Sequence, residues 1–141
     1  MGRSGYTDDF DDQWQMICWR GAVASAIKGR RGQAFLKEML AAIDGLPEPK
    51  LIAGELEEDG AVCAIGAVGK ARGVDMKGLD PEDHERLAKA FAISEALARE
   101  VMFMNDDDFF YGKETPEARW ARMRAWVVNQ IKERTPLTGD N

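Results

Sequence analysis

The stretch that decides the fold is Gly32-Gln-Ala-Phe35-Leu36-Lys-Glu-Met39-Leu40-Ala-Ala-Ile43-Asp-Gly-Leu46. Its large apolar residues recur every three or four positions, which is the period of one face of an α-helix. Gly45 and Pro47 end the pattern, because neither residue readily continues a helix. We therefore predict a helix that buries one face in a core and ends near residue 45.

A second apolar pattern precedes this one, between Asp12 and Ile27. Its core stripe is Met16, Trp19, Val23 and Ile27, widened by Ile17, Cys18 and Gly21. Helical spacing again predicts a helix. Gly29 and Gly32 bracket two arginines and interrupt the pattern, and so short a break predicts an antiparallel pair of helices.

After residue 50 the pattern changes. Leu51-Ile52-Ala53 and Ala61-Val62-Cys63 lie on either side of a Glu57-Glu58-Asp59-Gly60 turn, and the Asp-Gly step is a hairpin signal. Residues 63–73 then fit either a strand or a helix. We favour a helix that ends at Gly73, with small residues on one face that allow close packing.

The rest of the chain carries helix start signals at Asp80-Pro81, Ser94 and Thr115-Pro116. These helices are expected to end near Phe91, at Asn105 and before Pro136. The last one should bury Trp120, Met123, Val127 and Ile131. With 141 residues, 45% of them hydrophobic, the chain suits one core. We predict a mainly α protein: an acidic N-terminal arm (1–11), a single compact helical domain of five or six helices with a minor β-hairpin (12–135), and a disordered tail (136–141).

The charge balance indicates the compartment and the kind of partner. The formal net charge of −6 opposes sequence-independent binding to nucleic acid or to anionic lipid. The acidic start of the chain does not resemble a secretory signal, and no apolar run is long enough to span a membrane. We expect a cytoplasmic protein whose two cysteines, Cys18 and Cys63, are buried and reduced.

No motif identifies a reaction, so we assign no catalytic residue, metal or cofactor. His84 is the only histidine, and in a charged helix start it suits a solvated position. Cys63, His84 and Asn105 or Asp106 leave a Cys-dependent hydrolase as one alternative. Residues 66–72 lack the glycine and the hydroxyl of a phosphate-binding loop, and the carboxylates lack calcium-loop spacing.

Residues 85–101 leave a second alternative, because they resemble a helix-turn-helix. Ala88 would lie in the first helix, residues 92–94 in the turn, and Ala98 and Val101 in the core-facing side of the second. The exposed side of that second helix would carry Glu95, Ala96, Arg99 and Glu100, which is a poor match for phosphates. A small DNA-binding regulator is therefore only the runner-up.

Acidic residues that alternate with aromatic ones form the strongest asymmetry in the sequence. Such runs are often only solvated, but they also complement the basic surface of a nucleic-acid-binding protein. Trp126 lies about 100° from the centre of the last apolar stripe, beside Arg119 and Arg122, and suits either an interface anchor or the rim of the core. The predicted partner-binding residues are Asp8, Asp9, Asp11, Asp12, Asp106, Asp107, Asp108, Phe109, Phe110, Tyr111 and Trp126.

Several segments together resemble a family of small proteins of temperate bacteriophages and prophages, over most of the chain. They are Met1-Gly-Arg-Ser-Gly-Tyr6, Trp19 to Ile27, Gly32 to Phe35, Cys63-Ala-Ile-Gly-Ala67, Asn105-Asp106 and Glu114 to Trp120. The resemblance implies a bacterial cytoplasm and a phage accessory role, but it supplies no activity and no functional residue. We therefore expect a non-enzymatic protein that binds a host or phage protein.

Overall fold

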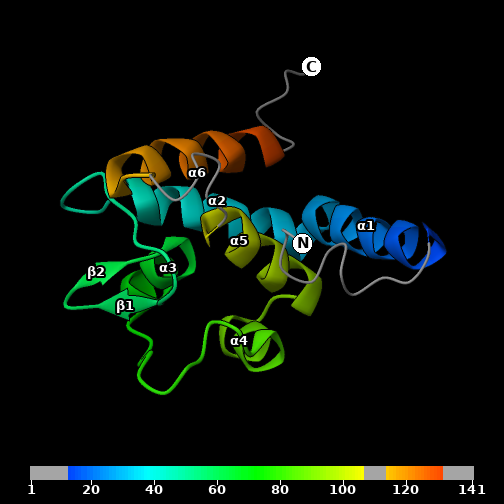
Figure 1. The fold of residues 1–141 in the computed structure, drawn as a ribbon, viewed down its shortest axis with the longest axis horizontal. Coiled ribbons are helices and arrows are strands. Elements are labelled where there is room, and N and C mark those ends of the chain that lie inside the picture. Colours follow the sequence, from blue (N-terminus) through cyan, green and yellow to red (C-terminus); the bar gives the residue numbers. More distant parts are fainter. Residues whose placement is uncertain (1–12, 107–113, 132–141) are drawn as a thin grey trace.

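The computed structural model describes residues 13–106 and 114–131, and it confirms a mainly helical fold with one small hairpin (Figure 1). The elements within these residues are α1 (Gln13–Lys28), α2 (Arg30–Asp44), β1 (Glu57–Glu58), β2 (Ala61–Val62), α3 (Ala64–Arg72), α4 (His84–Phe91), α5 (Glu95–Asp106) and α6 (Pro116–Gln130). The predicted arm and the predicted tail lie outside the described residues.

Helix α2 forms the centre of the core, as its apolar stripe predicts. Leu36, Met39 and Ile43 are fully or almost fully buried, and α2 packs against both α3 and α6. Helix α5 contacts α1, α3, α4 and α6. The core therefore lies where α2, α3, α5 and α6 meet, while α4 and much of α1 lie at its edge (Figure 1).

The predicted antiparallel pairing of the first two helices is wrong. Helices α1 and α2 extend in opposite directions from Gly29, so that α1 projects away from the body of the molecule (Figure 1). Gly29 is the one residue between them, which is too short a connection to reverse the chain. Gly32 belongs to α2 and does not break the helix. A Cβ atom there would overlap the carbonyl of Ala26, so the glycine lets α1 and α2 meet closely.

The hairpin forms, but its first strand differs from the prediction. Glu57 pairs with Val62 and Glu58 with Ala61, so β1 is two acidic residues rather than Leu51–Ala53. Asp59 and Gly60 both have positive φ, at 53° and 86°, as the tight Asp-Gly turn requires. The predicted strand still lies beside β2, because Ile52 N donates to Val62 O at 3.0 Å.

Residues 64–72 form a helix, α3, and Gly73 ends it in the left-handed conformation, as predicted. Cys63 is its N-cap: Sγ accepts a hydrogen bond from Gly66 N at 3.3 Å. The small residues do allow close approaches, and α2 is the helix with which α3 makes its most extensive contact. A Cβ atom at Gly66 would overlap the Leu56 carbonyl, so the segment before the hairpin fills that space.

Two helix boundaries differ from those predicted. Asp80 and Pro81 belong to a turn closed by the hydrogen bond from Asp83 N to Asp80 O, and α4 starts at His84 with Asp83 as its N-cap. Asn105 does not end α5 in the left-handed conformation but lies within its last turn, fully buried. The other start signals are confirmed, since Ser94 Oγ accepts from Leu97 N and Thr115 Oγ1 from Ala118 N.

Candidate functional site

The most elaborate polar cluster in the described residues surrounds Asn105 at the end of α5. Asn105 Oδ1 accepts a hydrogen bond from Ala64 N at 3.0 Å, at the start of α3. Its Nδ2 donates to Ile52 O and to Asp106 Oδ1, both at 2.9 Å. Asp106 Oδ1 also accepts from Gly54 N at 3.2 Å. One side chain therefore joins the 51–54 segment, α3 and α5.

A buried ion-pair cluster lies beside Asn105. The side chain of Glu114 is fully buried and contacts two arginines of α6. Arg122 donates from Nε and Nη2 to its two oxygens at 2.6 and 2.8 Å, and Arg119 Nε lies 3.3 Å from Oε1. Both guanidinium groups also donate to carbonyls at the end of α5, those of Met104 and Asn105.

Together these contacts satisfy helix ends that would otherwise be buried without partners. The last four carbonyl oxygens of an α-helix accept no hydrogen bond from an N–H group within the helix. Burying them without another donor is costly. Arg119 and Arg122 supply donors to α5, and Asn105 supplies an acceptor to the first turn of α3. The cluster accordingly has a structural explanation in each of its contacts.

The same geometry weakens the case for a Cys-dependent hydrolase. Cys63 precedes Ala64 and so lies beside Asn105, but the Cys63 thiol is fully buried and caps α3. Burial raises the pKa of Cys63 to about 12. A thiol with that pKa carries almost no thiolate near neutral pH, and the thiolate is the nucleophile.

His84 is half-buried rather than solvated, which corrects the prediction. Burial first, and then the charge of Arg99, lowers the pKa of His84 below its ordinary value. The carboxylates that act on it in the opposite sense are Glu95, Glu82 and Asp83. His84 therefore belongs to the packing between the start of α4 and α5.

The helix-turn-helix segment forms two helices joined by a tight turn, with Ala92 in the left-handed conformation. Ala88, Ala98 and Val101 are buried as predicted. The side of α5 that would read DNA is partly covered, however, because α1 packs against α5 and the Arg99 guanidinium lies 5.0 Å from the ring centroid of Trp19. Glu95 is exposed, while Ala96, Arg99 and Glu100 are half-buried. This arrangement does not favour α5 as a recognition helix.

Helix α1 carries a surface that the sequence analysis did not separate from the core. Val23 is buried, and Trp19, Ala26 and Ile27 are half-buried on the side that packs on the body. On the other side Trp14 is 70% and Ile17 is 58% exposed. We call this side the outer face; its members, all exposed, are Trp14, Ile17, Cys18, Gly21, Ala24 and Ser25.

Cys18 lies on the outer face and is exposed, which corrects the expectation that it is buried. Ile17, Cys18 and Gly21 do not widen the core stripe but form a second stripe on roughly the opposite side of the helix. The signal was present in the sequence: α1 is apolar around most of its circumference, and one helix at the edge of a fold cannot bury every side.

Charges are segregated along the molecule. No acidic residue occurs between Gln13 and Lys37, where five exposed basic residues lie: Arg20, Lys28, Arg30, Arg31 and Lys37. The hairpin at the opposite end carries exposed Glu57, Glu58 and Asp59 (Figure 1). Close to it, Glu55, Asp80 and Glu82 line a cleft of about 420 Å³.

Most of the predicted partner-binding residues lie outside the described part of the chain. Asp8, Asp9, Asp11 and Asp12, and Asp107 through Tyr111, lie outside the described residues. Asp106 is exposed, but its carboxylate accepts the hydrogen bonds from Gly54 and Asn105. Trp126 is half-buried against the core, and the two arginines expected to flank it, Arg119 and Arg122, bind Glu114 instead.

Residues 13–106 and 114–131 contain no group of three or more His, Cys, Asp or Glu side chains arranged to hold a metal ion. None of the helices in these ranges has both the length and the hydropathy of a membrane span.

Comparison of the chain with protein-family models, with curated proteins and with solved structures gave no match.

Proposed function

We propose that this protein acts without catalysis, by binding another protein through its surface. The observation that carries the proposal is the outer face of α1, where the large apolar side chains of Trp14 and Ile17 are exposed on a helix that already buries its other side. A helix that is apolar on all sides is normally enclosed. An uncovered apolar side that projects from the body is typical of an interaction surface.

The acidic and aromatic residues form the second part of the proposal. Residues 106–111 and 8–12 combine carboxylates with aromatic rings, which suits a partner with a basic surface, such as a host or phage protein that handles nucleic acid. The exposed carboxylates of the hairpin and of the cleft beside it add negative charge at one end of the molecule. The described residues of α1, by contrast, include Arg20 and Lys28 and no acidic residue.

The proposed setting is the cytoplasm of a bacterial cell, in a phage or prophage accessory role. The sequence resemblance described above supports this setting. The residues of that resemblance with described side chains are largely structural: Cys63 caps α3, Asn105 joins three segments, and Arg119 binds Glu114. They support a shared architecture rather than a shared reaction.

The test is affinity capture from bacterial lysate with three immobilised proteins. They are the wild type, the double variant Trp14→Ser and Ile17→Ser, and the control Ala90→Ser, which changes an exposed residue of α4. We expect a protein to be retained by the wild type and by the control and lost by the double variant. Failure to retain any protein from uninfected or infected cells at physiological salt would contradict the proposed function.

A further inference from the structure

The outer face of α1 has a shape that suits another helix. Its centre consists of small residues, Gly21, Ala24 and Ser25, with the large Trp14 and Ile17 toward the N-terminal end. At Gly21 a Cβ atom would meet nothing within 4 Å, so the space outside the helix there is open. Small residues along a helix allow the backbone of a second helix to approach closely.

The spacing of the outer face agrees with helix pairing. Trp14, Ile17, Gly21, Ala24 and Lys28 follow one another at intervals of three, four, three and four residues. This alternation is that of the contact positions in a two-helix coiled coil. The 16 residues of α1 span about 24 Å, so a partner helix of about four turns would cover the face.

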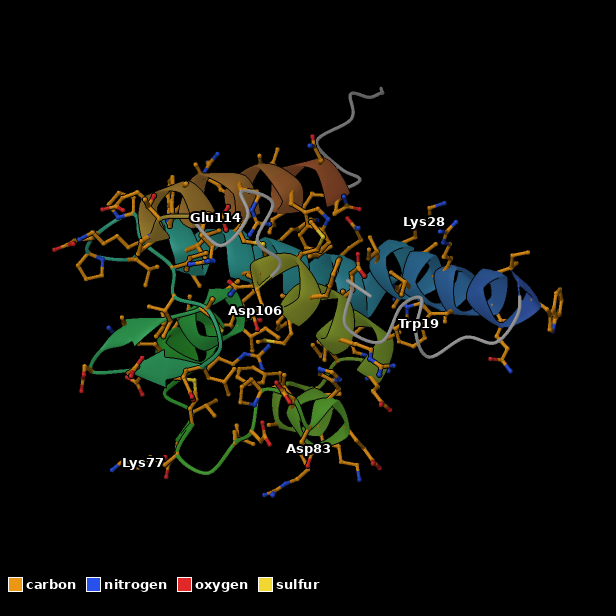
Figure 2. All side chains as sticks on the ribbon, in the orientation of Figure 1. Trp19, Lys28, Lys77, Asp83, Asp106 and Glu114 are labelled. Carbon is orange, nitrogen blue, oxygen red and sulfur yellow. The ribbon has the colours of Figure 1, made fainter. Side chains whose placement is uncertain are left out.

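The charge around the outer face determines the chemistry of the partner. Arg20 and Lys28 belong to α1 and both are exposed, and α1 contains no acidic residue. In Figure 2 the side chain of Lys28 points away from α5, on the side of α1 opposite to Trp19. A partner that covers this surface gains from carboxylates beside its apolar residues, and basic residues on it would be repelled.

On the basis of the proposed function, we propose that the outer face of α1 binds an acidic amphipathic helix of another protein. A parallel second copy is disfavoured, because Arg20 would oppose Arg20 and Lys28 would oppose Lys28, and α1 contains no carboxylate to pair with them. An anionic membrane is disfavoured by the small residues at the centre of the face, since membrane-surface helices present large apolar side chains there.

The test uses the full-length protein and two synthetic peptides of about two leucine heptads each, which make about four helical turns. The acidic peptide carries Glu at the positions that flank the leucines, and the basic peptide carries Lys at the same positions. Like charges keep each peptide from pairing with itself. Binding is measured by fluorescence anisotropy of the labelled peptide at about 0.15 M salt, near the physiological value.

We expect the wild type to bind the acidic peptide at least about tenfold more tightly than the basic one. The double variant Trp14→Ser and Ile17→Ser should lose binding, and Ala90→Ser should keep it. The double variant Arg20→Glu and Lys28→Glu should reverse the preference between the peptides, because its outer face becomes acidic. Circular dichroism checks that each variant remains folded.

Several outcomes would overturn this inference. They are equal binding of the two peptides, no binding of either, and binding that the outer-face variant retains. Three other results would assign another occupant to the outer face, provided that the outer-face variant abolishes them. They are binding to anionic phospholipid vesicles, binding to duplex DNA, and a rise in mass with protein concentration in sedimentation. The lysate experiment is judged separately: a protein that the wild type retains and the outer-face variant loses supports the proposed function whichever peptide binds, so the two failures are distinguishable.

Discussion

Asn105 and Ala64 are 41 residues apart in the chain, and the Asn105 side-chain oxygen accepts the backbone N–H of Ala64 at 3.0 Å in the interior. Asn105 is fully buried, and its amide nitrogen donates to Ile52 O. The contact fixes the end of α5 against the start of α3 and the segment that leads to the hairpin. Because each polar atom has its partner, the burial of an amide is compensated here.

Replacement of Asn105 should therefore be costly. Asn105→Leu leaves the Ala64 N–H and the Ile52 carbonyl buried without this partner, and we expect a loss of about 2–4 kcal/mol in the free energy of unfolding. Asn105→Asp keeps an acceptor for the Ala64 N–H but loses the donor to the Ile52 carbonyl, so it should also lower the free energy of unfolding. Urea denaturation measures both. A Leu variant as stable as the exposed control Ser25→Ala would contradict this account.

The carboxylate of Glu114 offers a second prediction, with a matched control on the surface. Glu114 is buried between Arg119 and Arg122, whereas Asp44 makes a partly exposed bidentate pair with Arg124 at 2.6 and 3.0 Å. Glu114→Ala leaves two arginines near the interior without their counter-ion, and we expect a loss of about 3–5 kcal/mol. Asp44→Ala should cost less than about 1 kcal/mol. Thermal and urea unfolding compare the two, and similar losses would show that burial is not the cause.

Elements whose signals in the sequence are local form as the sequence predicts. The helix around Met39, the Asp59–Gly60 turn and the caps Ser94 and Thr115 depend on residues within a few positions of one another, and the structure confirms them. The direction of α1 depends on the close approach of Gly32 to the Ala26 carbonyl. No periodicity encodes that approach, so the antiparallel pairing was wrong.

The candidate site was less predictable for the same reason. Asn105, Glu114 and Arg119 carry out their roles through partners that lie far along the chain, and nothing local distinguishes them from surface residues. Helix α1 is the opposite case, since its two apolar sides are visible in the sequence. Which side faces the body is decided by the packing of Trp19 and Val23 on the rest of the fold.

The two thiols should differ sharply in reactivity. Cys18 is exposed on the outer face, while Cys63 is fully buried and its pKa is raised to about 12 by burial. At mildly alkaline pH we expect a thiol reagent such as dithionitrobenzoate to modify one cysteine in the folded protein and both in denaturant. Cys18→Ser should abolish the reaction of the folded protein. Rapid modification of Cys63 in that variant would contradict the buried, capping position of the thiol.

His84 gives the stability a dependence on pH. Its pKa is lowered by burial and by Arg99, so the folded state binds the proton less readily than the unfolded chain does. Above the ordinary histidine pKa of about 6.5, His84 is neutral in both states and the free energy of unfolding has its full value. The free energy of unfolding decreases as the pH falls below about 6.5 toward the lowered pKa of the folded state, because the unfolded chain then binds the proton more readily. His84→Gln should reduce the change in the free energy of unfolding between about pH 7 and pH 5. The expected reduction is less than about 1 kcal/mol, because the side chain is only half-buried. Urea midpoints at the two pH values measure it, and an equal slope in both proteins would exclude His84 as the source.

Two helical glycines should respond in opposite directions to the same change. At Gly66 a Cβ atom would overlap the Leu56 carbonyl and would lie 3.1 Å from Val62 Cβ, so Gly66→Ala must displace the segment before the hairpin. We expect a loss of about 1–3 kcal/mol, as for other overpacked cores. At Gly21 nothing lies within 4 Å, and Gly21→Ala should gain about 0.5–1 kcal/mol, because alanine loses less backbone entropy in a helix. Urea unfolding of both variants tests the prediction. A loss at Gly21 as large as that at Gly66 would mean that the outer face of α1 is already packed against the protein, and it would remove the structural basis for docking a partner there.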